Sequence, residues 1–259
     1  MKSLARALYR KLKSGRGDKL DNRGSYLRLA RGLTRARDVD RAMQQAVGGE
    51  FEAVGLLELE TLKYFGLRED DYVVDVGCGS GRLALPLSQY LKGRYLGIDI
   101  VPDLVDYARR TVGRDDWRFE VAEGFTIPER DGEADVVCFF SVLTHLLHEQ
   151  SYVYLREARR VLKPGGIIVF SFLDFAVAGH WQVFETNIKD LNVNSHALNM
   201  FISKDAIGVW AGHLGLRVEA VKDADERFVP LSKPLVFESG AVMEKSGTIG
   251  QSVCVLRRD

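Results

Sequence analysis

Apolar residues are spaced in two ways along this chain. From about residue 72 onward, short runs rich in Val, Ile and Phe alternate with longer segments whose apolar positions recur at the period of a helix. The runs predict strands at 72–76, 94–98, 117–121, 136–140 and 167–172, and the segments between them predict helices at about 82–92, 102–112 and 150–162. A helix at about 203–214, a strand at 217–221 and an alternating strand at 251–256 follow. Strands that alternate with helices predict an α/β fold, with a parallel sheet covered by helices on both faces.

The part of the chain before this alternation has a different pattern. Residues 14–25 are polar and rich in Gly, which favours a linker or loop. Helical spacing of apolar residues follows at about 26–46 and again at 51–65, where Gly66 is placed to end the helix. We therefore predict a basic helical N-terminal extension over 1–45 and one domain over 46–259.

Charge distinguishes the extension from the rest of the chain. Lys plus Arg equal Asp plus Glu over the 259 residues, yet residues 1–41 carry a net charge of +9 and the remainder −9. Within residues 1–13, Leu4, Leu8 and Leu12 share one helical face among basic residues. Such a helix is able to lie on an anionic membrane surface. An RNA-binding arm, a transit-type peptide and a solvated arm are the alternatives.

The apolar runs and the three cysteines indicate where the protein is located and whether its thiols are reduced. No apolar run approaches the roughly 20 residues of a membrane span, and no apolar block follows the basic N-terminus as in a secretory signal. Cys78, Cys138 and Cys254 are odd in number and widely spaced within strand-like contexts. They are interpreted as buried free thiols rather than a disulfide framework or a metal site. A cytoplasmic protein is expected, with peripheral membrane contact through residues 1–13 as an added hypothesis.

The loop after the first predicted strand carries the strongest chemical signal. The strand ends in Asp75, and Gly77, Gly79 and Gly81 follow at alternate positions before a helix. Glycines permit backbone conformations closed to other residues and let a ligand approach the main chain. A loop at the carboxyl end of a parallel strand is where open α/β sheets bind ligands. The third glycine comes one residue earlier than in a dinucleotide-binding motif, where Arg82 stands instead.

Acidic residues follow the next two predicted strands. Asp99 ends the second strand, where a carboxylate accepts both hydroxyls of a ribose; the alternative is a helix-capping acid before Pro102. Glu123 follows the third strand, with a solvated loop acid as its alternative. The turn Leu162–Gly166, with the sequence LKPGG, precedes the fifth strand.

Together these motifs resemble the class I S-adenosylmethionine (SAM) methyltransferases over residues 51–172, with 251–256 as the family's last strand. The resemblance implies a Rossmann-like, seven-stranded, mostly parallel sheet with an antiparallel seventh strand, and SAM as cofactor. It implies that the loop with Gly77, Cys78, Gly79 and Gly81 abuts the methionine part of SAM, and that Asp75 orders this loop. It further implies contacts from Asp99 to the ribose, from Ile100, Glu123, Gly124 and Phe125 to the adenine, and from Phe140 and Ser141 to the amino group. The family usually has Asp where Glu123 stands.

Candidates for a general base are histidines beyond the fourth and fifth strands. His145 follows the fourth strand and His180 lies in an insert at about 173–201; both have structural alternatives. The insert also holds Phe175, Trp181, Phe184 and Phe201, which favours an apolar or ring-bearing acceptor, with core packing as the alternative.

We therefore expect methyl transfer from SAM to a small-molecule, sugar or lipid-linked acceptor, by O-methylation rather than N-methylation. The alternatives are an RNA or protein methyltransferase that uses the basic arm, and a non-catalytic binding module. The sequence Phe140–Leu143 replaces the Asn-Pro-Pro-Tyr type of motif, which argues against amino-directed nucleic-acid methylation. No metal site is expected. The identity of the acceptor and the oligomeric state are not predicted.

Overall fold

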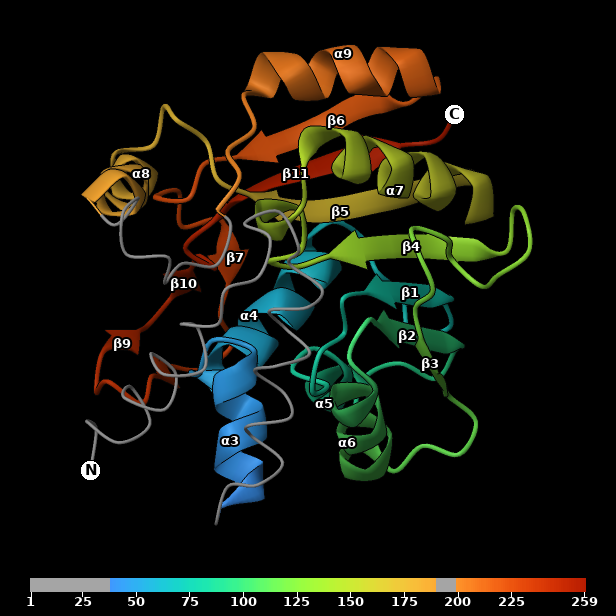
Figure 1. Cartoon of the computed structure of the whole chain (residues 1–259). Coiled ribbons are helices and arrows are strands. Elements are labelled where there is room, and N and C mark those ends of the chain that lie inside the picture. The colour runs from blue at the N-terminus through green and yellow to red at the C-terminus, as the bar shows by residue number, and fades with distance from the viewer. Residues whose placement is uncertain (1–37, 190–198) are drawn as a thin grey trace, which may run out of the picture.

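A seven-stranded sheet forms the centre of the computed structural model, which describes residues 38–189 and 199–259 (Figure 1). The strand order is β3-β2-β1-β4-β5-β11-β6. Its strands are β1 (Val73–Val76), β2 (Tyr95–Asp99), β3 (Arg118–Val121), β4 (Ala134–Phe139), β5 (Leu162–Phe172), β6 (Arg217–Lys222) and β11 (Ser252–Arg257). Strand β11 is antiparallel to both neighbours, whereas β1 to β5 pair in parallel. The predicted fold class is confirmed.

Helices cover both faces of this sheet, and its central strands such as β1 are therefore buried on both faces. Val73 packs in one apolar cluster with α4 (Phe51–Tyr64), α5 (Ala84–Leu87) and α6 (Pro102–Val112). The adjacent Val74 packs in a second cluster with α7 (His148–Val161) and α9 (Lys204–Leu214), which lie in front of the sheet in Figure 1. Side chains alternate across a strand, so a continuous apolar run serves two helical layers.

Two predicted elements differ from the structure, and further elements form where none is predicted. Helix α5 is only one turn long, and Pro86, which lacks an N–H, lies within that turn. Strand β5 begins at Leu162 rather than 167, and Gly165 within the LKPGG turn donates to the carbonyl of Arg258 at 2.6 Å. Helix α8 (Ala178–Lys189) occupies much of the insert. Four short strands pair in the stretch between β6 and β11: β7 (Val229–Pro230), β8 (Leu235–Val236), β9 (Val242–Met243) and β10 (Ser246–Gly247).

Helix α3 (Val39–Ala46) is the described part of the helix predicted at 26–46. Asp38 caps its first turn by accepting from the N–H of Arg41 at 3.1 Å. Met43 is buried against Val101, Leu104 and Tyr107, which belong to α6 and the residue before it. The basic helix predicted at 1–13 and the linker at 14–25 lie outside the described residues, and the division at residue 45 stays a prediction.

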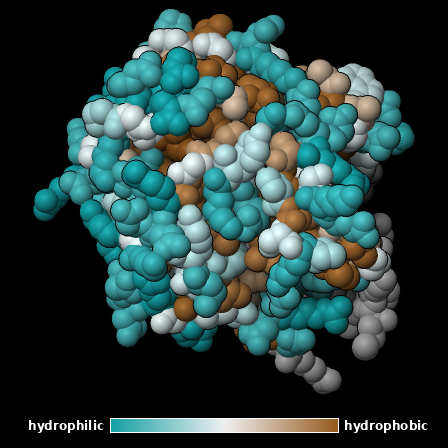
Figure 2. Space-filling view, turned by 180° about the vertical axis from the view of Figure 1, so that it is seen from behind, coloured by the Kyte–Doolittle hydropathy of each residue, from teal (hydrophilic) through white to brown (hydrophobic). Residues whose placement is uncertain are grey.

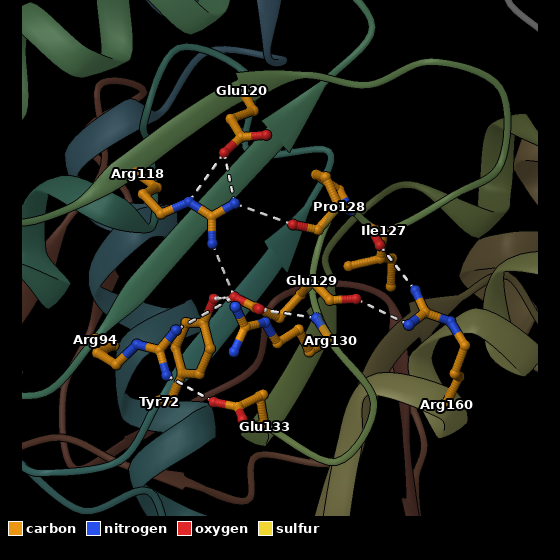
Figure 3. A network of polar contacts seen from close by, with 10 residues as sticks. All are labelled: Tyr72, Arg94, Arg118, Glu120, Ile127, Pro128, Glu129, Arg130, Glu133 and Arg160. Carbon is orange, nitrogen blue, oxygen red and sulfur yellow. Dashed lines mark hydrogen bonds and ion pairs between the residues drawn. The ribbon is translucent and has the colours of Figure 1, made fainter.

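A network at the amino ends of three strands holds one corner of the sheet (Figure 3). Glu129 accepts from Tyr72 before β1, from Arg94 before β2 at 3.4 Å and from Arg118 in β3 at 2.8 Å. Arg160 of α7 donates to the carbonyl of Glu129 at 2.8 Å. The Glu129 side chain is 6% exposed, so the network ties the loop before β4 to strands that are distant in sequence. It lies at the opposite ends of the strands from the glycine loop.

The surface seen from behind is largely hydrophilic, with hydrophobic residues gathered in separate patches (Figure 2). All three cysteines are free and buried, as predicted. In the described ranges, no helix is both long and apolar enough to cross a membrane.

Candidate cofactor site

The glycine loop turns sharply between β1 and the chain leading to α5. Gly77 and Gly79 have φ angles of 78° and 54°, which favour glycine. The N–H groups of Gly77 and Cys78 both donate to the carbonyl of Ile98, at 2.7 and 3.0 Å. A Cβ on Gly77 would stand 2.3 Å from Val142, and one on Gly81 would stand 3.2 Å from Ala108 of α6. The lack of a side chain at Gly77 therefore lets the loop pack close to the end of β4, and the lack of one at Gly81 lets it pack close to α6.

Asp99 joins this loop to the end of β2. One carboxylate oxygen accepts from the N–H of Gly79 at 3.0 Å, and the other accepts from the N–H of Val101 at 2.9 Å. Desolvation raises the pKa of Asp99 to about 6, although these N–H groups act in the opposite direction. Each carboxylate oxygen has a second lone pair. Asp99 therefore fits a ligand that offers two hydroxyl donors, as a ribose does.

Asp75 lies beneath the loop rather than in an open cleft. It is buried and accepts from the Tyr95 hydroxyl at 2.8 Å, with the Cys138 thiol 3.7 Å away. Burial raises the pKa of Asp75 to about 7. These contacts join β1 to its neighbours β2 and β4, and the predicted role of Asp75 in ordering the loop stays a prediction.

Polar side chains that sequence reasoning did not single out tie the loop to the helices before β1. The Ser80 hydroxyl donates to the carbonyl of Met43 in α3 at 2.9 Å. Arg82 donates to the carbonyl of Val47 at 2.6 Å and pairs with the buried Glu58 of α4 at 2.5 Å. Arg82 stands out in sequence only as a basic residue directly after the glycines. Nothing in the sequence indicates its partners.

The loop after β3 lies next to Asp99, because the N–H of Ala122 donates to the Asp99 carbonyl at 2.7 Å. Glu123 is exposed in this loop. The carbonyl of Gly124 accepts from the Tyr154 hydroxyl at 3.2 Å. The rings of Phe125 and Tyr154 pack edge to face, with their centroids 5.3 Å apart.

Ile100, on the other side of Asp99, packs against the apolar cluster that includes Met43. The residues assigned to adenine thus come from neighbouring segments, and their contacts with a ligand stay predictions.

The end of β4 supplies the opposite wall. Phe140 is buried, whereas Ser141 is half-buried with a φ angle of 59°, unusual for a residue other than glycine. The one-turn helix η1 (Leu143–His145) follows, so His145 lies just beyond this wall and is half-buried. The role of His145 as a general base stays a prediction.

His180 occupies a different kind of position. Its Nδ1 accepts from the N–H of Asp174 at 2.9 Å, which leaves Nε2 to donate to the carbonyl of Gly250 at 3.3 Å. Both ring nitrogens are therefore used, and the ring is buried. A proton taken up at Nδ1 would break the first bond, so the geometry argues against a general base and makes His180 a connection between α8 and the segment before β11.

The glycine loop, Asp99 and the end of β4 thus surround a site at the carboxyl ends of β1, β2 and β4, suited to a nucleoside with a charged tail. A sequence model of the methyltransferase domain family matches residues 74–170. This part of the chain is therefore a methyltransferase domain of the SAM-dependent kind. SAM is accordingly the cofactor of its domain.

Individual relatives match at modest identity. A ubiquinone biosynthesis O-methyltransferase of Hydrogenovibrio crunogenus is 28% identical, over 71% of this chain and 78% of the relative. A ribosomal protein L11 methyltransferase of Clostridium botulinum is 31% identical over 40% of this chain and 32% of the relative. The chain spans less than half the length of several curated relatives.

A solved structure supports the fold alone. It is the methyltransferase in a complex with the Haloferax volcanii Trm112 methyltransferase activator. The TM-score is 0.61 at 19% identity, and the match covers 89% of this chain and 97% of that chain.

Proposed function

We propose that this protein transfers the methyl group of SAM to a hydroxyl of a small molecule that carries an apolar or aromatic part. The observation that carries this proposal is the aromatic cluster of the insert, which is joined to the segment after β4 by a hydrogen bond from Met200 to Thr144. O-methylation is supported by the similarity to a ubiquinone biosynthesis O-methyltransferase over most of that relative's length.

The aromatic cluster contains residues that are far from fully buried. Phe175 and Phe201 stack with ring centroids 4.8 Å apart, and Phe184 meets both edge to face. Phe175 and Trp181 each remain 44% exposed. Aromatic side chains that pack on one another yet stay accessible are suited to an apolar ligand.

The cluster is also placed next to the end of β4. Strand β5 leads into it, and Leu173 forms an isolated parallel bridge with Phe201. The N–H of Met200 donates to the carbonyl of Thr144 at 2.7 Å, within the one-turn helix that carries His145. An acceptor held by the aromatic rings would therefore lie between the insert and the cofactor wall.

The protein's own residues would hold the methyl donor in position and remove a proton from the acceptor. When bound, SAM supplies a methyl group activated for in-line displacement. Asp99 and the glycine loop would hold the nucleoside and orient the donor, and proximity can carry much of the rate. His145 would remove the proton from the acceptor hydroxyl.

The test is a methyl-transfer assay with the full chain and SAM. The probes are an ortho-dihydroxyphenyl compound with an apolar chain, its matched amine analogue and an unfolded polypeptide. We expect a mono-O-methylated phenol by mass spectrometry and formation of the demethylated cofactor, both lost in Asp99→Asn. Methylation of only the amine or only the polypeptide would contradict the proposed acceptor class.

A further inference from the structure

Three polar side chains form a closed hydrogen-bonded ring between the cofactor wall and the last strand. The N–H of Ser141 donates to the Ser171 hydroxyl at 2.7 Å. The Ser171 hydroxyl donates to Gln251 Oε1 at 2.6 Å, and Gln251 Nε2 donates to the Ser141 hydroxyl at 3.2 Å. The ring joins the ends of β4 and β5 to the residue that precedes β11.

The hydrogen bonds of this ring run in one direction. The Ser171 oxygen accepts from the N–H of Ser141 and donates its own proton to Gln251 Oε1. This orients the Gln251 amide, whose NH₂ group then points at the Ser141 hydroxyl. Among side chains of this length only an amide accepts at one end and donates at the other. The Ser141 oxygen thus accepts, and its proton stays available for a ligand oxygen.

Ser141 needs such support because of its backbone. A φ angle of 59° is disfavoured for residues with a Cβ and persists where surrounding contacts fix it. The ring fixes Ser141 at both its N–H and its hydroxyl. Ser171 is fully buried in β5, so the support is rigid on that side.

Gln251 is itself held in place by the acceptor-side insert. The carbonyl of Gly250, one residue earlier, accepts from Nε2 of His180 in α8. The N–H of Gly250 donates to Thr248, whose hydroxyl donates to the carbonyl of Ala224 at 2.7 Å. The contacts therefore run from α8 through His180 and Gln251 to Ser141.

We propose that Gln251 and Ser171 are positioning residues that hold Ser141 in its cofactor-facing conformation, and that His180 links this arrangement to the insert. The proposal rests on the proposed function for the identity of the cofactor. It adds two residues to the site, and it gives His180 a role other than that of a base.

The test measures binding of the demethylated cofactor to the full chain by calorimetry, with melting temperatures alongside. We expect Gln251→Ala and Ser171→Ala each to weaken binding roughly tenfold, the equivalent of one lost hydrogen bond. Gln251→Glu should also weaken it, because a carboxylate cannot donate to Ser141. Gln182→Ala, which removes the same amide from an exposed position of α8, should bind as the wild type does.

A rescue separates positioning from general destabilisation. Glycine adopts positive φ without support, so Ser141→Gly added to Gln251→Ala should restore the part of the lost affinity that comes from the backbone conformation, although not the part that comes from the Ser141 hydroxyl. Wild-type affinity in Gln251→Glu, or no rescue in a double variant that melts like the wild type, would overturn the proposal. A wild-type protein that binds neither SAM nor its product would instead refute the cofactor assignment itself.

Discussion

Asp99 places a titratable carboxylate against the expected ribose position. Its pKa of about 6 means that it is largely ionised at neutral pH and protonated below that value. A ligand that donates two hydroxyl protons requires the ionised form. We therefore expect affinity for the demethylated cofactor to fall as pH drops from 7 to 5, approaching tenfold per pH unit at the acidic end. Calorimetry across this range should show the change, and Asp99→Asn should bind weakly with a flatter profile. Undiminished binding by Asp99→Asn would contradict the assignment.

Protonation of Asp75 should make the free energy of unfolding depend on pH. Its pKa is about 7 in the folded protein and near 3.8 in the unfolded chain, so between these values only the folded state holds the proton. The free energy of unfolding should therefore decrease as pH rises from 4 to 7, by up to about 1.4 kcal/mol per pH unit from this group. Urea denaturation of Asp75→Asn should show a shallower decrease. Asp106→Asn, at a side chain 62% exposed, is the matched control and should keep the wild-type slope.

At the scale of elements, Arg82 couples the glycine loop to two helices. It neutralises the buried Glu58 of α4 and holds the carbonyl of Val47 after α3. Arg82→Gln would leave a buried carboxylate without its charge partner, which costs about 3 kcal/mol. We expect a lower free energy of unfolding in urea together with weaker binding of the demethylated cofactor. Lys92→Gln breaks a pair whose side chains are 80% and 49% exposed and should change neither quantity measurably. Equal effects of the two substitutions would contradict this role.

The network around Glu129 predicts a loss of stability without a loss of binding. Glu129→Gln removes the charge that Arg94 and Arg118 share at the amino ends of the strands (Figure 3). We expect about 1–2 kcal/mol of destabilisation by urea denaturation, since both arginines remain partly hydrated. Glu133→Gln, at a carboxylate 39% exposed with Arg94 as its partner, should cost under about 0.5 kcal/mol. A marked loss of cofactor affinity in Glu129→Gln would show that this corner is not independent of the site.

At the scale of the whole molecule, the contacts of helix α3 concern where the N-terminal extension ends and the domain begins. Met43 of this helix is buried, and its carbonyl accepts a hydrogen bond from the Ser80 hydroxyl of the glycine loop. We expect that removing residues 1–46 lowers the melting temperature and cofactor affinity relative to removing residues 1–37 alone, because only the longer deletion takes away these contacts. Differential scanning calorimetry and binding of the demethylated cofactor provide the comparison. Identical behaviour of the two truncations would support a boundary after α3.

The sequence by itself determined the layered sheet, the place of the glycine loop and the acid at the end of β2. Each of these depends on local rules: buried strands need continuous apolar runs, and a tight ligand loop needs residues that accept positive φ. Tertiary structure alone decided which polar side chains meet. Gln251 lies 110 residues after Ser141, to which it is hydrogen-bonded, and Ser80 lies 37 residues after its partner Met43. Such pairs share no local pattern, because register and helix docking bring them together only once the sheet has assembled. For the same reason the sequence favours His180 as a base, although in the structure its Nδ1 accepts from the N–H of Asp174 and its Nε2 donates to the carbonyl of Gly250.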